Sequence, residues 1–158
     1  VQKITSKDQT YFAATQKYKT VGATDEVKEG PNYVQVTDNR GTEAGWSLKV
    51  KQEGQFKSTS GKELTGAAIT FKNGNVVTAS DSGKPTGPAT ITLNSDGSQS
   101  DVMSAAKGNG AGTYLFDWGT DATTAAKSIE LTVPGSTTKY AEKYATKLTW
   151  TLTDAPGN

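Results

Sequence analysis

Asp117 and Asp121 are a pair of carboxylates whose spacing suggests acid–base chemistry or calcium binding. A carboxylate pair in a glycosidase needs a cleft and one raised pKa, and the pattern indicates neither. The segment 94–97 superficially matches a calcium loop, but it lacks the alternating acidic ligands and the terminal Glu of an EF-hand, so we predict a hairpin turn there. The 158 residues include no Cys and no His, which excludes thiol nucleophiles, Ser-His-Asp triads, disulfides and zinc sites built on those ligands. We therefore predict a protein that is not an enzyme and uses no metal or cofactor.

Asp38 and Arg40 are two residues apart, so in a strand they lie on one face and can pair. Gly41 and Gly45 follow and supply turn or bulge geometry. We interpret the group as a turn that fixes the strand after it. Because Arg40 is the only arginine and its guanidinium binds carboxylates through two parallel hydrogen bonds, ligand recognition is the alternative.

One tripeptide pattern occurs twice, as Trp46-Ser47-Leu48 and as Trp150-Thr151-Leu152. Residues i and i+2 share a face only in a strand, so each Trp stands beside its Leu if both segments are extended. Two interpretations stay open for these four side chains. They are core, since a buried Trp contributes about 150–250 Å² of contact area, or they are an edge or groove platform that stacks on sugar rings.

Short alternating runs of apolar and polar residues, separated by turn residues, are the elements that must position these side chains. The clear runs lie around Val34, Trp46, Ile69, Val76, Ile91, Tyr114, Ile129 and Leu148, and Val102 and Met103 form a weaker one. Asn73-Gly74 predicts a hairpin between two of them. Weaker strands are expected at 2–4 and 10–14, the segment 15–29 is mostly polar, and 120–127 has the pattern of one or two helical turns. About nine strands at this spacing predict an all-β, single-domain antiparallel β-sandwich, immunoglobulin-like or related, with little helix.

Composition narrows the function classes. Hydrophobic residues make up 33%, and the net charge is +1 with Lys scattered along the chain, so we expect no nucleic-acid partner. No apolar run approaches the roughly 20 residues of a membrane span. The chain starts at Val1 rather than Met, which favours a mature or excised piece of a longer precursor.

Two longer motifs carry a family resemblance. The segment 33–50, which includes Asp38, Arg40 and Gly45-Trp46-Ser47-Leu48, resembles the first motif of the WxL family, and the segment 144–156, which includes Leu148-Thr149-Trp150-Thr151-Leu152, resembles the second. Their order and spacing agree with the family, and the similarity covers nearly the whole chain, 1–158. The resemblance implies a non-catalytic module of Gram-positive surface proteins that attaches its parent non-covalently to peptidoglycan of the cell wall.

The resemblance also implies a membrane-anchored partner protein encoded nearby. Family members usually have a further strand upstream of the segment that residues 2–4 resemble, so the resemblance leads us to expect a domain without its first N-terminal strand. We keep two alternatives to wall attachment. One is a protein-interaction module that docks such a partner, or a host extracellular matrix protein, by strand addition. The other is a structural spacer, in which Lys–Asn isopeptide cross-links are possible.

Overall fold

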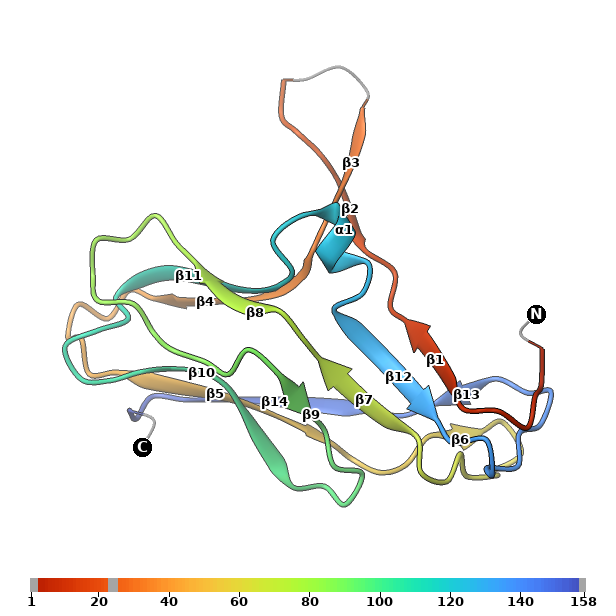
Figure 1. The fold of residues 1–158 in the computed structure, drawn as a ribbon. Helices are drawn as coiled ribbons and strands as arrows, with labels where there is room; N and C mark the ends of the chain where they lie inside the picture. Colours follow the sequence, from red (N-terminus) through yellow and green to blue (C-terminus); the bar gives the residue numbers. More distant parts are fainter. Residues whose placement is uncertain (1–2, 23–25, 157–158) are drawn as a thin grey trace.

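The computed structural model describes residues 3–22 and 26–156, and it consists of two layers of antiparallel strands (Figure 1). Two sheets lie end to end in the first layer, because the chain runs from one into the other at residues 72–73. Their strands, in spatial order, are β1 (Gln9–Phe12), β12 (Ile129–Val133), β7 (Ala68–Phe71) and β9 (Ile91–Thr92) in one sheet, and β4 (Asn32–Asp38), β11 (Gly112–Trp118) and β8 (Gly74–Val77) in the other.

The second layer is a three-stranded sheet of β10 (Gln99–Ala105), β5 (Trp46–Gln52) and β14 (Leu148–Thr153), in that order. A short pair, β6 (Lys57–Ser58) and β13 (Tyr144–Ala145), continues toward the other end of the molecule. The only helix in the described part of the chain is α1 (Ala122–Ala125). The prediction of an all-β antiparallel fold with little helix is confirmed. The immunoglobulin-like topology stays a prediction.

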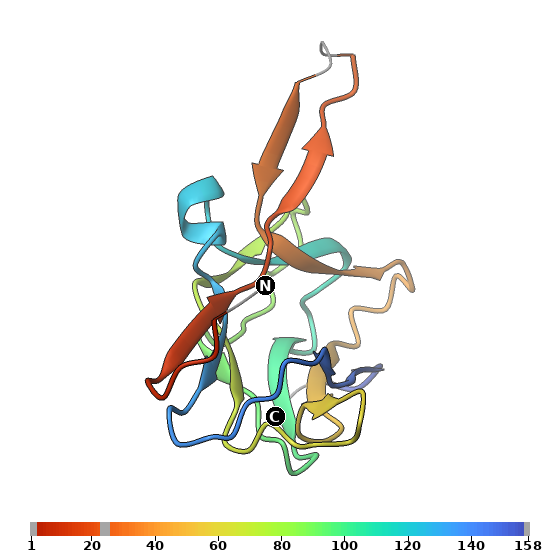
Figure 2. The ribbon, with the colours of Figure 1, turned by 90° about the vertical axis from the view of Figure 1, so that its right-hand side faces the viewer.

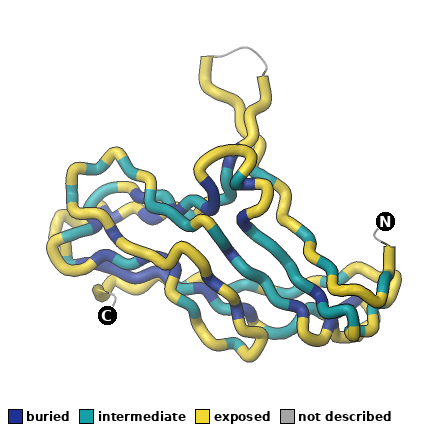
Figure 3. The backbone as a smooth tube through the Cα atoms, viewed as in Figure 1, coloured by how far each residue is buried: buried dark blue, intermediate teal, exposed yellow. Residues whose placement is uncertain are grey.

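The core lies between the two layers, toward which the alternating runs turn their apolar faces. Figure 3 shows where the buried residues lie along the backbone. Its largest fully buried side chains include Trp46, Tyr114, Phe116 and Met103. A smaller apolar cluster of Leu64, Ala67 and Val133 lies under β1 and β12. The sequence pattern identified most of this core because inward positions in these strands recur with a period of two.

The prediction of a hairpin at Asn73-Gly74 is wrong. β7 pairs with β12 and β9, and β8 pairs with β11, so the chain passes from one sheet to the next without reversing. A two-residue type I′ hairpin needs a positive φ at both central residues, and only Asn73 has one, at 56°. The Gly74 N–H instead donates to Ala89 O at 2.9 Å. A side chain at Gly74 would meet the Phe116 ring, so close packing explains this glycine.

The polar segment 15–29, for which no strand was expected, contains a hairpin of β2 (Gln16–Lys19) and β3 (Val27–Gly30) that projects from the layers (Figures 1 and 2). The residues of both strands are exposed except Gly30, which is buried at the base of the hairpin, so the segment needs no apolar period. The expected strand at 10–14 corresponds to β1 and the expected helical turns to α1. Of the expected strand at 2–4, Gln2 lies outside the described residues, and Lys3 and Ile4 are not in a strand.

Candidate functional site

The two Trp-x-Leu tripeptides lie on neighbouring strands of one sheet. β5 and β14 are antiparallel, with Leu48 opposite Leu152 and Val50 opposite Trp150. The four motif side chains therefore project toward the same inner face, with the leucines in the middle and the tryptophans diagonally apart. Motifs separated by 104 positions in the sequence thus form one surface.

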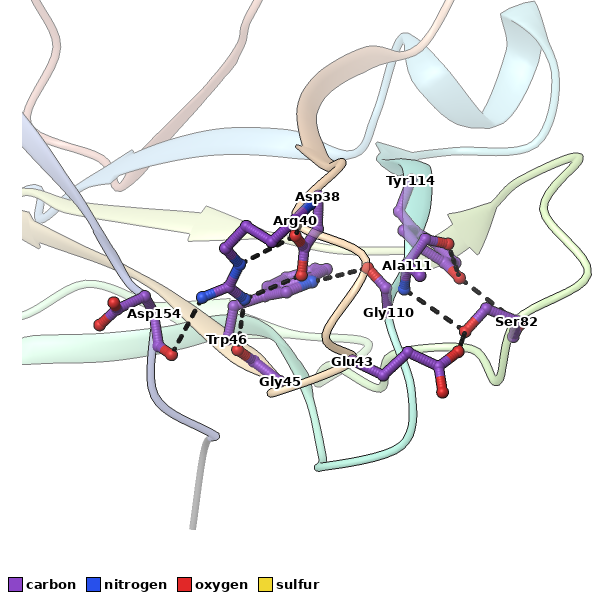
Figure 4. A network of polar contacts seen from close by, with 10 residues as sticks. All are labelled: Asp38, Arg40, Glu43, Gly45, Trp46, Ser82, Gly110, Ala111, Tyr114 and Asp154. Carbon is purple, nitrogen blue, oxygen red and sulfur yellow. Dashed lines mark hydrogen bonds and ion pairs between the residues drawn. The ribbon is translucent and has the colours of Figure 1, made fainter.

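The first tripeptide belongs to the core. Trp46 is 2% exposed, and its indole Nε1 donates to Gly110 O at 2.9 Å (Figure 4). Its ring lies 6.2 Å from the Tyr114 ring, and Leu48 is buried beside it. A buried indole needs an acceptor for its N–H, and the loop before β11 supplies one.

The second tripeptide lies at an open edge. β14 has a partner only on its β5 side among the described strands, and Trp150 and Leu152 are 39% and 57% exposed. Trp150 still lies next to the core, with its ring 6.1 Å from the Trp118 ring and tilted by 52° to it. The buried Trp118 Nε1 next to it has no hydrogen-bond partner within the described residues. The same sequence pattern therefore produces a buried pair on β5 and a half-exposed pair on β14.

The two long sides of the molecule differ. On one side the segment 86–93 bridges both layers, because Thr86 exchanges backbone hydrogen bonds with Ser104 of β10 and Leu93 N donates to Ile69 O of β7. On the other side, between β4 and β14, no backbone hydrogen bond joins the layers in the described part of the chain. Trp150 and Leu152 lie on this open side.

Asp38 and Arg40 form a bidentate ion pair at one end of the open side (Figure 4). Arg40 Nε donates to Asp38 Oδ1 at 2.9 Å and Arg40 Nη2 to Oδ2 at 2.8 Å. These hydrogen bonds lower the pKa of Asp38 to about 2. Arg40 Nη2 also donates to Gly45 O at 2.9 Å, and Nη1 to Asp154 O at 3.4 Å. The guanidinium thus connects the turn before β5 with the end of β14, and most of its donors are used within the protein.

Gly41 and Gly45 both have positive φ, at 69° and 85°. A Cβ at Gly45 would lie 2.6 Å from Ala105 O, whereas one at Gly41 would meet nothing within 4 Å. Gly45 therefore allows the turn to approach β10 closely, and Gly41 supplies only backbone conformation.

A cavity of about 260 Å³ joins the two motifs, and we refer to it as the motif pocket. Its lining combines the Asp38–Arg40 pair and an edge of Trp46 with Leu152 and its neighbours at the end of β14. The arrangement offers an apolar wall beside a partly exposed guanidinium, which suits a ligand with both apolar and polar groups.

The two carboxylates Asp117 and Asp121 lie in different surroundings. Asp121 is the N-cap of α1 and accepts from Thr124 N at 2.7 Å, and Asp117 has its pKa raised by burial. Within residues 3–22 and 26–156, no group of three or more Asp or Glu side chains is arranged to hold a metal ion. The same residues include no helix long and apolar enough to cross a membrane.

Comparison with known protein families matches residues 1–156 to the WxL domain, described as surface cell wall-binding. The chain belongs to the WxL family. It is therefore a binding module of the cell surface and the cell wall. No curated protein and no solved structure matches it.

Proposed function

We propose that this WxL domain attaches its parent protein to peptidoglycan non-covalently and catalyses no reaction. The contact surface in this proposal is the open edge of β14, with Trp150 and Leu152, together with the motif pocket. One observation carries it: of two matching tripeptides in the same sheet, one is buried and the other exposes a Trp and a Leu. Half-exposed aromatic side chains on a rigid strand present a flat apolar face to a sugar ring at low entropic cost.

Sedimentation with purified cell-wall sacculi tests this proposal. The wild-type domain should pellet with sacculi, and Trp150→Ala should remain largely in the supernatant. Phe12→Ala is the matched control, because Phe12 is also an aromatic residue on an edge strand and is 48% exposed. Circular dichroism must show that both variants are folded. Equal pelleting of Trp150→Ala and wild type would exclude this edge as the contact surface.

We propose strand addition to a membrane-anchored partner protein as a second candidate function, because β4 and β14 both have a free edge within the described residues. Glu53 N donates to Lys147 O, so the alternation of an antiparallel ladder directs the N–H groups of Leu148, Trp150 and Leu152 toward the free edge of β14. A partner strand would find unpaired donors and acceptors there, flanked by apolar side chains.

Leu152→Pro and Leu152→Ala separate this candidate from glycan stacking. Both remove the leucine side chain, but only proline removes an outward N–H, and proline is tolerated on edge strands. Pull-down with the ectodomain of the membrane-anchored protein encoded beside the chain should fail for Leu152→Pro and succeed for Leu152→Ala. Equal capture of the two variants would contradict strand addition at β14.

A further inference from the structure

A second cavity, of about 520 Å³, lies between the β1–β12 pair and the segment 139–144. Three tyrosines line it, Tyr11, Tyr140 and Tyr144, and we refer to it as the tyrosine pocket. Its volume is in the range of small-ligand sites, and its lining is mainly apolar and aromatic with a few charged groups. None of its residues belongs to the Trp-x-Leu pairs or to the motif pocket.

The apolar floor of the tyrosine pocket is the smaller core cluster. Leu64 and Val133 are buried there, and Tyr11, Leu131 and Tyr144 pack against them while remaining partly exposed. Tyr140, at the rim, is 42% exposed. Its N–H donates to the Tyr144 hydroxyl at 2.9 Å, which fixes the two tyrosines relative to each other. The cluster is therefore a preformed apolar surface that the described residues leave open.

The lining of the tyrosine pocket has a net positive charge, because it includes three lysines, Lys3, Lys139 and Lys143, and one carboxylate, Glu142. The Glu142 carboxylate accepts from the Ser60 N–H at 3.0 Å and from the Ser60 hydroxyl, so its acceptors are already used within the protein. Lys139 Nζ donates to three backbone carbonyls, among them Pro134 O at 3.0 Å, so it contributes a fixed positive charge but no free N–H, and Lys3 and Lys143 are the lysines that could donate to a ligand. No ion pair involves any of these three lysines in the part of the chain that the structure describes.

The tyrosine pocket and the motif pocket have the same construction. Each lies between an edge strand of the first layer, β1 or β4, and the C-terminal segment of the chain. Leu152, in the lining of the motif pocket, follows Tyr144 by eight residues, which an extended chain spans in at most about 29 Å. One polymer chain is long enough to reach both places.

We propose that the tyrosine pocket binds a carboxylate-bearing unit of the wall polymer, that is, an acidic amino sugar or the short peptide attached to it. The inference rests on the proposed function, because its ligand is a piece of the same polymer. The tyrosine rings and leucines pack on the sugar face or on aliphatic side chains, and the lysines attract the carboxylate. Two weak sites for one polymer give a combined affinity greater than either site alone.

Amide NMR titration of the whole 158-residue chain tests the inference with four probes. They are muramyl dipeptide, N-acetylmuramic acid, the stem tetrapeptide and the neutral sugar chitotetraose. The acidic probes should shift the amides of Tyr140 and Tyr144, and chitotetraose should not. Binding by the peptide alone or by the acidic sugar alone identifies which carboxylate is recognised, and either result supports the inference.

Variants locate the contact. Tyr140→Ala should weaken binding of the best acidic probe about ten-fold, and Lys143→Gln about three-fold, with a steeper salt dependence for wild type than for Lys143→Gln. Tyr18→Ala and Lys107→Gln are matched controls, since Tyr18 is 50% exposed on the projecting hairpin and Lys107 is exposed near β10, and both should bind as wild type. Lys143→Gln removes a surface charge without a packing change, so it stays informative if Tyr140→Ala misfolds.

Two results would overturn the inference. One is chitotetraose binding as tightly as the acidic probes, and the other is shifts confined to Trp150 and Leu152. The second result leaves wall attachment at the β14 edge intact. Conversely, the domain could stay in the supernatant with sacculi while the acidic probes shift the amides of Tyr140 and Tyr144. That result would contradict wall attachment but would support carboxylate binding in the tyrosine pocket.

Discussion

Trp46 and Trp150 occupy the same place in the same tripeptide, but the first is buried and the second is partly exposed. Trp46 is on a central strand and is covered by β11 and the loop before it, whereas Trp150 is on an edge strand with its ring beside that of Trp118. Burial depends on the position of the strand in the sheet, which the tripeptide itself does not specify.

Substitution of each tryptophan by alanine should separate stability from binding. Trp46→Ala leaves a large cavity and an unpaired Gly110 carbonyl, so we expect a loss of about 3–5 kcal/mol in the free energy of unfolding. Trp150→Ala should cost only about 1 kcal/mol, because the ring is 39% exposed. Urea unfolding followed by fluorescence measures both. Equal losses would mean that Trp150 is as buried in solution as Trp46.

Substitutions at Arg40 test whether Asp38 is its main partner. Arg40→Gln should lower the free energy of unfolding, because it leaves the Asp38 carboxylate 7% exposed and without its cation. Arg40→Lys should retain only part of this stability, because a lysine keeps the positive charge but cannot make the bidentate contact. Asp38→Asn in the Arg40→Gln background should recover stability. A double-mutant cycle in urea measures this coupling, and additive effects would contradict it.

At the scale of elements, local sequence patterns predicted where the strands lie, but they did not predict which strands pair with each other. The runs at Trp46, Tyr114 and Leu148 were predictable because inward residues alternate along half-buried strands. Pairing between β5 and β14, 104 residues apart, depends on long-range packing, and the sequence showed only that both have the same stripe. The hairpin prediction at Asn73-Gly74 was wrong because the close packing of Gly74 against Phe116, a tertiary contact, outweighs the local hairpin signal. The tyrosine pocket left no sequence signal, since Tyr11 and Tyr144 come from opposite ends of the chain.

The turn between β4 and β5 offers a matched pair of glycines. Gly45→Ala should destabilise the domain by more than about 2 kcal/mol, because it combines a strained φ with a clash against Ala105 O. Gly41→Ala has the strain but open space around it, so about 1 kcal/mol is expected. Thermal or urea unfolding ranks the two variants. A larger loss for Gly41→Ala would show that the turn has another conformation in solution.

At the scale of the whole molecule, two carboxylates connect segments distant in the sequence. Asp38 pairs with Arg40, which reaches Asp154 at the end of β14, and Glu142 binds the loop after β6. Arg40 lowers the pKa of Asp38 to about 2, and the hydroxyls of Ser58 and Ser60 with the Ser60 N–H lower that of Glu142 to about 2. Their ordinary values are 3.8 and 4.5, which are those of the unfolded chain.

These two carboxylates predict the acid sensitivity of the domain. A carboxyl pKa that is lower in the folded state adds stability above the unfolded value, and this is lost as pH falls through the folded value. The free energy of unfolding should therefore be level down to about pH 5 and decrease between about pH 4.5 and 2. Asp38→Asn and Glu142→Gln should each be less stable at pH 7 and show a shallower decrease. Asp101→Asn, at a side chain that is 75% exposed, should follow the wild-type profile. Urea midpoints at pH 7, 5, 4, 3 and 2 measure the profiles, and an unchanged slope in Asp38→Asn would show that its pair with Arg40 does not form in the folded protein.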